Sequence, residues 1–135
     1  MSGVHAEVCV GAVAVAGDRI LLVRRGQEPG RGLWSVPGGR VEAGEALADA
    51  VVRELAEETG VAGTCGRLLG VAEHREVGHH FVILDYLVVA EPEPPVAGTD
   101  VDEAAWVPLS AVPDLPLVPG LDRFLTEHGP GSSVR

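Results

Sequence analysis

The chain has 135 residues, of which 46% are hydrophobic, so it is long enough for one globular domain with a core of ordinary size. Its ten basic residues, all arginine, are outnumbered by 20 acidic ones, which gives a net charge of −10. This charge argues against nucleic acid as a partner and repels a polyphosphate at long range. Attraction of a phosphorylated ligand therefore has to come from bound metal and a few local arginines.

The sequence also indicates where the protein works. Its N-terminal segment lacks the basic start and small-residue cleavage site of a secretory signal, and no apolar run approaches the roughly 20 residues of a membrane span. Cys9 and Cys65 are too few and too far apart for a disulfide framework. We expect a soluble, cytoplasmic protein with two free thiols and no membrane partner.

The first third of the chain predicts a hairpin followed by a loop. Apolar runs at residues 8–15 and 20–23 read as strands, and Gly17-Asp18 between them is a turn signal. Residues 27–32 predict a loop, and residues 34–36 a short extended piece that ends at Pro37.

The middle of the chain predicts one helix. Gly38, Gly39 and Gly44 favour a loop, after which a helix is expected to begin at Glu45 or Ala46 and to end near residue 59, with the following glycine as its left-handed C-terminal residue.

The remainder predicts strands and a second helix. Strands are expected at 67–76, 80–90 and 105–109, a proline-rich loop up to Gly98, a turn at 110–115, a helix at 119–128 and a frayed tail from 129. There are no repeats, so residues 1–135 form one domain. The two helices are expected on opposite faces of one mixed sheet, which is an α/β fold.

Three glutamates crowd the end of the predicted central helix. At about 100° per residue, Glu57 and Glu58 flank Glu54 within an arc of roughly 100°, at the negative end of the helix dipole. Arg53 can offset one charge through its i,i+4 pairing with Glu57. A divalent cation offsets more, and Mg²⁺ prefers carboxylate oxygens and phosphates.

The alternative is an ordinary solvated helix face, because a run of charges is usually surface. Glu58, however, projects between Leu47 and Val51, two residues of the core-facing stripe, so it is expected to be partly buried. A buried carboxylate needs a partner.

Residues 39–61 follow a defined spacing of glycine, acidic, basic and aliphatic residues. It fits the pattern Gly, five residues, Glu, seven residues, Arg-Glu, an aliphatic, any residue, Glu-Glu, any residue, Gly, an aliphatic. The positions are filled by Gly39, Glu45, Arg53, Glu54, Leu55, Glu57, Glu58, Gly60 and Val61. This is similar to the Nudix box, without departures. Residues 32–38, GLWSVPG, and 103–109, EAAWVPL, resemble segments that flank the box in this family.

The resemblance implies a Nudix hydrolase with an α/β/α sandwich and a mixed sheet, which cleaves a nucleoside diphosphate linked to another group X with Mg²⁺ or Mn²⁺. It implies Glu57 and Glu58 as first metal ligands and the backbone carbonyl of Gly38 as an additional one. Glu54 is a further ligand or the group that orients or deprotonates the attacking water. Arg53 is expected to orient Glu57.

Further residues are assigned with open alternatives. Glu45 is as readily a structural first-turn residue as a functional one. Arg24, Arg25 and Arg40 flank the box and are candidates to grip phosphate, because arginine presents a planar fork to its oxygens.

Acidic, histidine and aromatic residues outside the box are further candidates for metal or substrate contacts. Glu103 is the first choice, ahead of the neighbouring aspartates at 100 and 102, for the extra acid that binds metal or acts as base in many relatives, and we expect it to be a metal ligand. His79 and His80 point to opposite faces of a strand, so zinc ligation is not expected. Trp34 and Phe81 are candidates to stack on a base, although core packing is the commoner role.

Sequence markers of substrate are absent for coenzyme A, NADH, dinucleoside polyphosphate and typical ADP-ribose enzymes. The lead-in and the strand at 80–86 nevertheless resemble small bacterial members that act on ADP-ribose or nucleoside triphosphates, and these two substrates are near-equal candidates. A homodimer is common among relatives. The alternatives are a nucleotide-binding sensor without catalysis and, last, a Ca²⁺-binding structural protein, which lacks an EF-hand loop.

Overall fold

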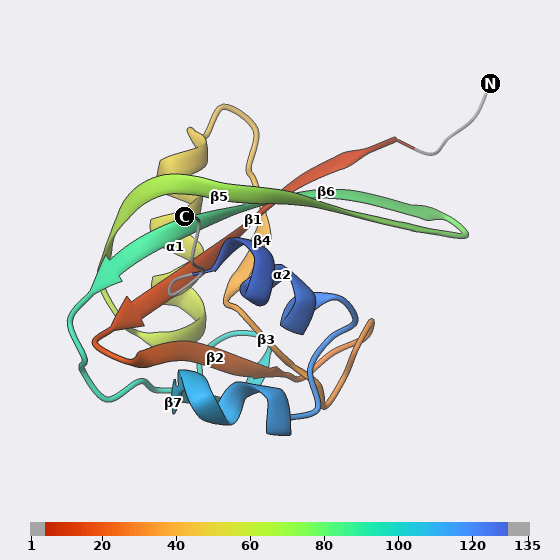
Figure 1. The fold of residues 1–135 in the computed structure, drawn as a ribbon. Coiled ribbons are helices and arrows are strands. Elements are labelled where there is room, and N and C mark those ends of the chain that lie inside the picture. The colour runs from red at the N-terminus through yellow and green to blue at the C-terminus, as the bar shows by residue number, and fades with distance from the viewer. Residues whose placement is uncertain (1–4, 130–135) are drawn as a thin grey trace.

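The computed structural model describes residues 5–129, which form one mixed sheet with helical segments on both sides (Figure 1). In chain order the elements are β1 (Glu7–Ala16), β2 (Arg19–Arg25), β3 (Trp34–Ser35), β4 (Gly38–Arg40), α1 (Leu47–Thr59), β5 (Gly63–Glu76), β6 (His79–Ala90), β7 (Val101–Pro108), the 3-10 helix η1 (Leu109–Asp114) and α2 (Leu121–His128).

The sheet is built around β1. The strand order is β3-β2-β1-β6-β5, with β7 beside β2 and the short β4 beside β1. β1 forms the predicted antiparallel hairpin with β2 through the pair Val15↔Ile20, and it runs parallel to β6. The first half of β1 pairs with β4, with Gly11 opposite Gly38. β1 therefore connects the segment around Gly38 to β6.

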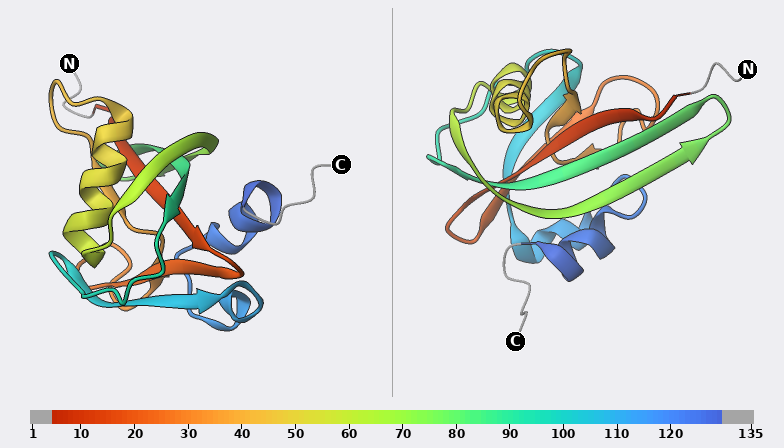
Figure 2. Two further views of the ribbon diagram at one scale, coloured as in Figure 1. Left: turned by 90° about the vertical axis from the view of Figure 1, so that its left-hand side faces the viewer. Right: turned by 90° about the horizontal axis from the view of Figure 1, so that it is seen from above.

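The helices pack on opposite faces of the sheet, as expected (Figure 2). On one face, Val51 and Leu55 of α1 join a core cluster that includes Val10 and Ala12 of β1. On the other face, the alternate β1 residue Val13 belongs to a second cluster, whose partly buried neighbours include residues of η1 and α2. The period-two alternation of β1 thus supplies both cores.

The C-terminal end of α1 follows the sequence prediction. Gly60 has φ 73°, the left-handed conformation that glycine adopts without strain, and its N–H donates to the Ala56 carbonyl at 2.9 Å. The Thr59 hydroxyl donates to the Leu55 carbonyl at 2.7 Å and accepts from the Val61 N–H at 3.2 Å. The box therefore ends in a tightly bonded turn that fixes the position of its last glutamates.

Several predicted boundaries were wrong. Gly38–Arg40 is a strand and not a loop, because the edge of β1 offers it backbone partners. α1 begins at Leu47, since Glu45 accepts a hydrogen bond from the Glu42 N–H at 3.0 Å in a turn before the helix.

The other boundaries shift for similar reasons. β5 begins at Gly63 and β7 at Val101, because each pairs with a long neighbour, and residues 109–114 form a 3-10 helix. α2 begins at Leu121, after Gly120 with φ 85°, so Pro119 lies before it. The frayed tail was predicted from residue 129 on, and residues 130–135 lie outside the described part of the chain.

Within residues 5–129, no helix has both the length and the apolar character needed to cross a membrane.

Candidate functional site

Arg53 is the centre of the charged network on α1. Its Nε and Nη2 donate to the two carboxylate oxygens of Glu45 at 2.7 and 2.9 Å, and its Nη1 donates to Glu54 at 3.0 Å and to Glu57 at 3.1 Å. Nη2 also donates to the Arg40 carbonyl at 3.1 Å. The predicted contact with Glu57 is confirmed, but the guanidinium holds three glutamates instead of one.

Glu45 has a structural role in this network. Its bidentate pairing with Arg53, followed by the Glu42 N–H, lowers the pKa of Glu45 to about 2. An ionised Glu45 fixes the guanidinium plane, and with it the positions of the two glutamates that Arg53 also contacts. Of the two alternatives that the sequence left open for Glu45, this pairing favours a positioning role.

Glu58 is partly buried, as predicted, and its partner is a backbone group. Its Oε1 accepts the Gly38 N–H at 3.1 Å. The pKa of Glu58 is raised to about 7, chiefly by burial and also by the charges of Glu54 and Asp100, against the opposing effects of the Gly38 N–H and Arg25. The carboxylate is therefore held in a place where its negative charge is costly.

Glu54 shares this property. Its side chain is 13% exposed, and burial raises its pKa despite the hydrogen bond from Arg53. The residue facing it is Gly39, where a Cβ would lie 2.5 Å from a Glu54 carboxylate oxygen. Glycine at this box position leaves space for the carboxylate, which a side chain would force to move.

The register of β4 presents the Gly38 backbone to α1. Hydrogen bonds join Ala12 N–H to the Pro37 carbonyl at 2.8 Å and Val41 N–H to the Val8 carbonyl at 3.1 Å. Along an antiparallel strand, residues whose backbone groups hydrogen-bond to the partner strand alternate with residues whose backbone groups point away from it. Gly38 is one of the latter, so its N–H and carbonyl point away from β1. The N–H reaches Glu58, and the carbonyl lies on the same side of the strand.

These donors fit a hard divalent cation. Glu54 and Glu58 are two half-buried carboxylates whose pKa values are raised by burial, and the charge of Glu54 also raises the pKa of Glu58. The one arginine beside them is already shared among three acids. Mg²⁺ and Mn²⁺ take carboxylate and carbonyl oxygens, which is the set supplied by Glu54, Glu57, Glu58 and Gly38. Among residues 5–129, no group of three acidic, histidine or cysteine side chains is arranged to hold a metal ion, and Arg53 pairs with Glu54 and Glu57.

The flanking arginines are separated by the fold. Arg24 pairs with Glu103, its neighbour across β2 and β7, at 3.3 Å, and Arg40 pairs with Glu7 at 3.0 Å. Arg25 instead donates to the Pro29 carbonyl at 2.6 Å, and its charge acts on Glu58. Of the three predicted phosphate contacts, Arg25 is the one that is electrostatically coupled to the box.

Asp100, which the sequence ranked behind Glu103, lies close to the end of α1. It adopts φ 66°, accepts from Gln27 Nε2 at 2.8 Å and raises the pKa of Glu58. Its loop is fastened to the end of α1, where Gly98 N–H donates to the Glu58 carbonyl at 3.0 Å and Thr99 N–H to the Glu57 carbonyl at 3.2 Å. The helix end and this loop therefore form one unit, which no local sequence pattern indicates.

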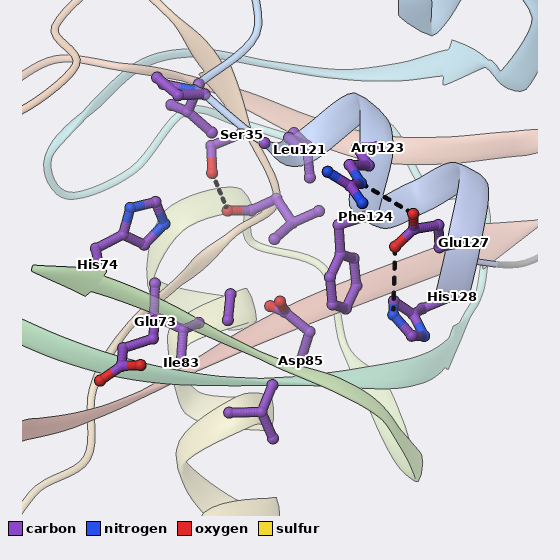
Figure 3. Close-up of a pocket in the computed structure, with 16 residues that line it drawn as sticks. Ser35, Glu73, His74, Ile83, Asp85, Leu121, Arg123, Phe124, Glu127 and His128 are labelled. Carbon is purple, nitrogen blue, oxygen red and sulfur yellow. Dashed lines mark hydrogen bonds and ion pairs between the residues drawn. The ribbon is translucent and has the colours of Figure 1, made fainter.

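A cavity of about 510 Å³ lies between the β5–β6 ribbon and α2 (Figure 3). Its volume is within the roughly 300–1,000 Å³ typical of small-molecule sites. Its lining includes Ser35, Val36, Ile83, Asp85, Phe124 and His128. Ser35 and Val36 of this lining immediately precede the Pro37-Gly38 segment, whose Gly38 N–H contacts Glu58 of α1.

The candidates for base stacking are placed elsewhere. Trp34 is 8% exposed and belongs to the core, and Phe81 stacks on His79 with ring centroids 5.7 Å apart. His80 contacts Glu73 at 2.6 Å. The aromatic ring that lines the cavity is Phe124 of α2, which sequence reasoning did not single out.

Comparisons with known proteins identify the family of this chain. A model of the NUDIX domain matches residues 5–128, and the chain therefore belongs to the Nudix hydrolase family. An ADP-ribose pyrophosphatase of Methanocaldococcus jannaschii is 34% identical over 113 residues, which is 82% of this chain and 67% of that protein. Human diphosphoinositol polyphosphate phosphohydrolase 3-alpha is 45% identical over 74 residues, 55% of this chain and 44% of its own length. The chain thus spans from less than half to about two thirds of these two relatives.

Solved structures show the same fold. A MutT NUDIX hydrolase from Burkholderia pseudomallei superposes with a TM-score of 0.80 at 34% identity and covers 90% of this chain and 96% of its own. A bifunctional NMN adenylyltransferase/ADP ribose pyrophosphatase from Francisella tularensis, complexed with AMP and a Mn ion, superposes with a TM-score of 0.79 at 28% identity. That match covers 93% of this chain and 42% of the other. The α/β sandwich predicted from the sequence is confirmed.

Proposed function

We propose that this protein hydrolyses the diphosphate bond of a nucleoside diphosphate linked to another group X and depends on Mg²⁺ or Mn²⁺. The observation that carries the proposal is the pair of half-buried carboxylates, Glu54 and Glu58, beside the Gly38 backbone. Folding alone gives no reason to place two mutually repelling acids there. The family membership and the Mn ion bound by the Francisella neighbour support the same conclusion.

The residues divide the work as follows. Glu57, Glu58 and the Gly38 carbonyl would hold the cation, which when bound supplies charge neutralisation at the phosphate oxygens and activation of water. Glu54, whose pKa is raised by burial, is suited to accept the proton of the water that attacks phosphorus. The P–O bond to the leaving group then breaks, which gives a nucleoside monophosphate and the phosphate of X.

Arg53 and Arg25 have different roles. Arg53 positions Glu54 and Glu57, because its side chain is already engaged by five hydrogen bonds. Arg25 is the arginine placed to meet substrate phosphate, while Arg24 and Arg40 would have to leave Glu103 and Glu7 to do so.

The extra acid is assigned to Asp100 ahead of Glu103. Glu103 stays a predicted metal ligand, but its side chain is 54% exposed and is paired with Arg24. Asp100 is coupled to Glu58 through charge and through the loop fastened to α1.

ADP-ribose is the proposed substrate ahead of a (d)NTP, because the Methanocaldococcus relative bears that name and the Francisella neighbour binds AMP. The cavity beside Ser35 and Val36 is the proposed place for the nucleoside. Cytoplasmic location and a possible homodimer stay predictions.

The test is product release from ADP-ribose, nucleotide sugars, the eight (d)NTPs and diadenosine polyphosphates, with Mg²⁺ or Mn²⁺. Turnover by the unmodified chain that is lost in Glu57→Gln and Glu58→Gln, but kept in Asp49→Asn on the exposed first turn of α1, is expected. Tight metal-dependent nucleotide binding without turnover would overturn the enzyme and favour the sensor.

A further inference from the structure

Asp85 of β6 has no part in the chemistry proposed above, yet it is one of the most buried acids of the described chain. The residue is 6% exposed, and its Oδ1 is buried without a hydrogen-bond partner. Burying a carboxyl group without a partner destabilises a folded protein, so such a group calls for an explanation.

The neighbouring strand is shaped to admit this carboxyl group. Gly11 of β1 is paired with Asp85, and a Cβ at Gly11 would collide with Oδ1. The Asp85 side chain therefore fits only because its neighbour is glycine. Two residues of separate strands are matched to keep an unsatisfied acid at this point.

The carboxyl group points into the cavity (Figure 3). It rises from β6 into the space between Ile83 and the Phe124 ring. Other charged side chains of the lining have partners: Arg123 pairs with Glu127 at 2.9 Å, and Glu73 pairs with His80, which lies outside the lining, at 2.6 Å. Asp85 supplies a buried polar atom without a partner to a lining that also includes the apolar residues Ile83 and Phe124. A few polar groups among apolar side chains are the usual composition of a small-molecule site.

We propose that Asp85 is a specificity-determining residue that accepts a hydrogen bond from the amino group of a nucleobase bound in this cavity. The inference rests on the proposed function, since it assigns the cavity to the nucleoside half of the substrate. It predicts a preference for adenine, guanine or cytosine over bases that lack an amino group. Phe124 supplies an aromatic surface beside the same base.

The position of Asp85 favours the base over the ribose. Gly38, Gly11 and Asp85 lie opposite one another on β4, β1 and β6. Neighbouring strands are spaced about 4.8 Å apart, so Asp85 is roughly 10 Å from the Gly38 backbone where the phosphates are expected. The ribose is attached directly to the phosphate and lies nearer to it, whereas the far edge of the base reaches the greater distance.

The experiment uses nucleotide pairs that differ only in a base amino group. Guanosine monophosphate is compared with inosine monophosphate, and adenosine monophosphate with purine riboside monophosphate, by calorimetric titration with Mg²⁺. The variants are Asp85→Asn, which keeps the shape, and Asp122→Asn, a matched change on the exposed side of α2 away from the cavity. ADP-ribose and nucleoside triphosphate hydrolysis are measured separately.

We expect the unmodified chain to bind the amino-bearing member of at least one pair about 10- to 100-fold more tightly, the range for a hydrogen bond to a charged group. Asp85→Asn keeps an acceptor oxygen but loses the charge, so it should lower that ratio by about tenfold, whereas Asp122→Asn should leave it unchanged. Equal binding of both members by the unmodified chain overturns the inference, even if Asp85→Asn fails to fold. The inference is also overturned if Asp85→Asn changes only the relative affinity for adenosine monophosphate and 2′-deoxyadenosine monophosphate, because Asp85 then binds the ribose.

The two proposals fail separately. If the chain shows the expected base preference, if Asp85→Asn weakens that preference, and if the chain hydrolyses none of the substrates, the hydrolase proposal is contradicted and the assignment of Asp85 is supported. If the chain hydrolyses nucleotides but its base preference is unchanged by Asp85→Asn, only the assignment of Asp85 is contradicted.

Discussion

Glu58 Oε1 accepts the Gly38 N–H at 3.1 Å and thereby joins the last turn of α1 to β4. This contact places a raised-pKa carboxylate beside a backbone carbonyl that has no partner on β1. A cation and a proton therefore compete for the same group.

Metal affinity should depend on pH through Glu58. Its pKa is about 7, so the proton has to leave before the cation binds. The Mn²⁺ dissociation constant, measured by calorimetry or electron paramagnetic resonance, is expected to fall by about tenfold or more between roughly pH 5.5 and 7.5 and then to level off. A flat profile would show that Glu58 is not a ligand.

Gly39→Ala should damage the site more than the fold. The added Cβ would lie 2.5 Å from the Glu54 carboxylate, the movable end of a side chain, so Glu54 should shift and the backbone should not. We expect Mn²⁺ affinity and kcat to fall about tenfold or more while the melting temperature changes by only a few degrees. Unchanged Mn²⁺ affinity and kcat would contradict the assigned role of Glu54.

Arg53→Lys should separate charge from geometry. Lysine keeps the positive charge but lacks the fork that grips both oxygens of Glu45. A loss of about 10- to 100-fold in kcat is expected, as for other residues that orient ligands. The control is Arg67→Lys on an exposed position of β5, which should be neutral in the same assay.

Asp100→Asn and Glu103→Gln decide which acid completes the site. Asp100 is coupled to Glu58, and Glu103 is paired with Arg24. The Asp100 variant should therefore lose more activity at limiting Mg²⁺, with partial recovery as Mg²⁺ is raised. The reverse ranking would restore Glu103 as the additional ligand.

Asp85 should make the protein less stable as pH rises. Burial raises its pKa from 3.8 to about 6, so the folded state binds the proton more tightly than the unfolded chain. The stabilisation is complete below about pH 3.8 and is lost as pH rises to about 6. Asp85→Asn should remove this slope, about 2 to 3 kcal/mol between the two limits, in urea unfolding measured with and without the substitution. If the free energy of unfolding changes with pH in the same way for both proteins, ionisation of Asp85 does not destabilise the fold.

Local spacing in the sequence was sufficient to group the glutamates, to mark the end of α1 and to locate the long strands. Helical periodicity grouped Glu54, Glu57 and Glu58 and predicted a half-buried Glu58, and Gly60 marked the end of the helix. Alternating apolar runs located the hairpin and the long strands, because side-chain direction repeats over two residues along any strand.

Only the tertiary structure decided which distant residues meet. Strand register paired Arg24 with Glu103 and left Arg25 to act on Glu58, although the two arginines are adjacent in the sequence. Packing of α2 over β6 placed Phe124 beside Asp85 at one cavity. Local periodicity determines the face on which a side chain lies, whereas its neighbour across the sheet depends on the register of strands far apart in the chain, which no local pattern encodes.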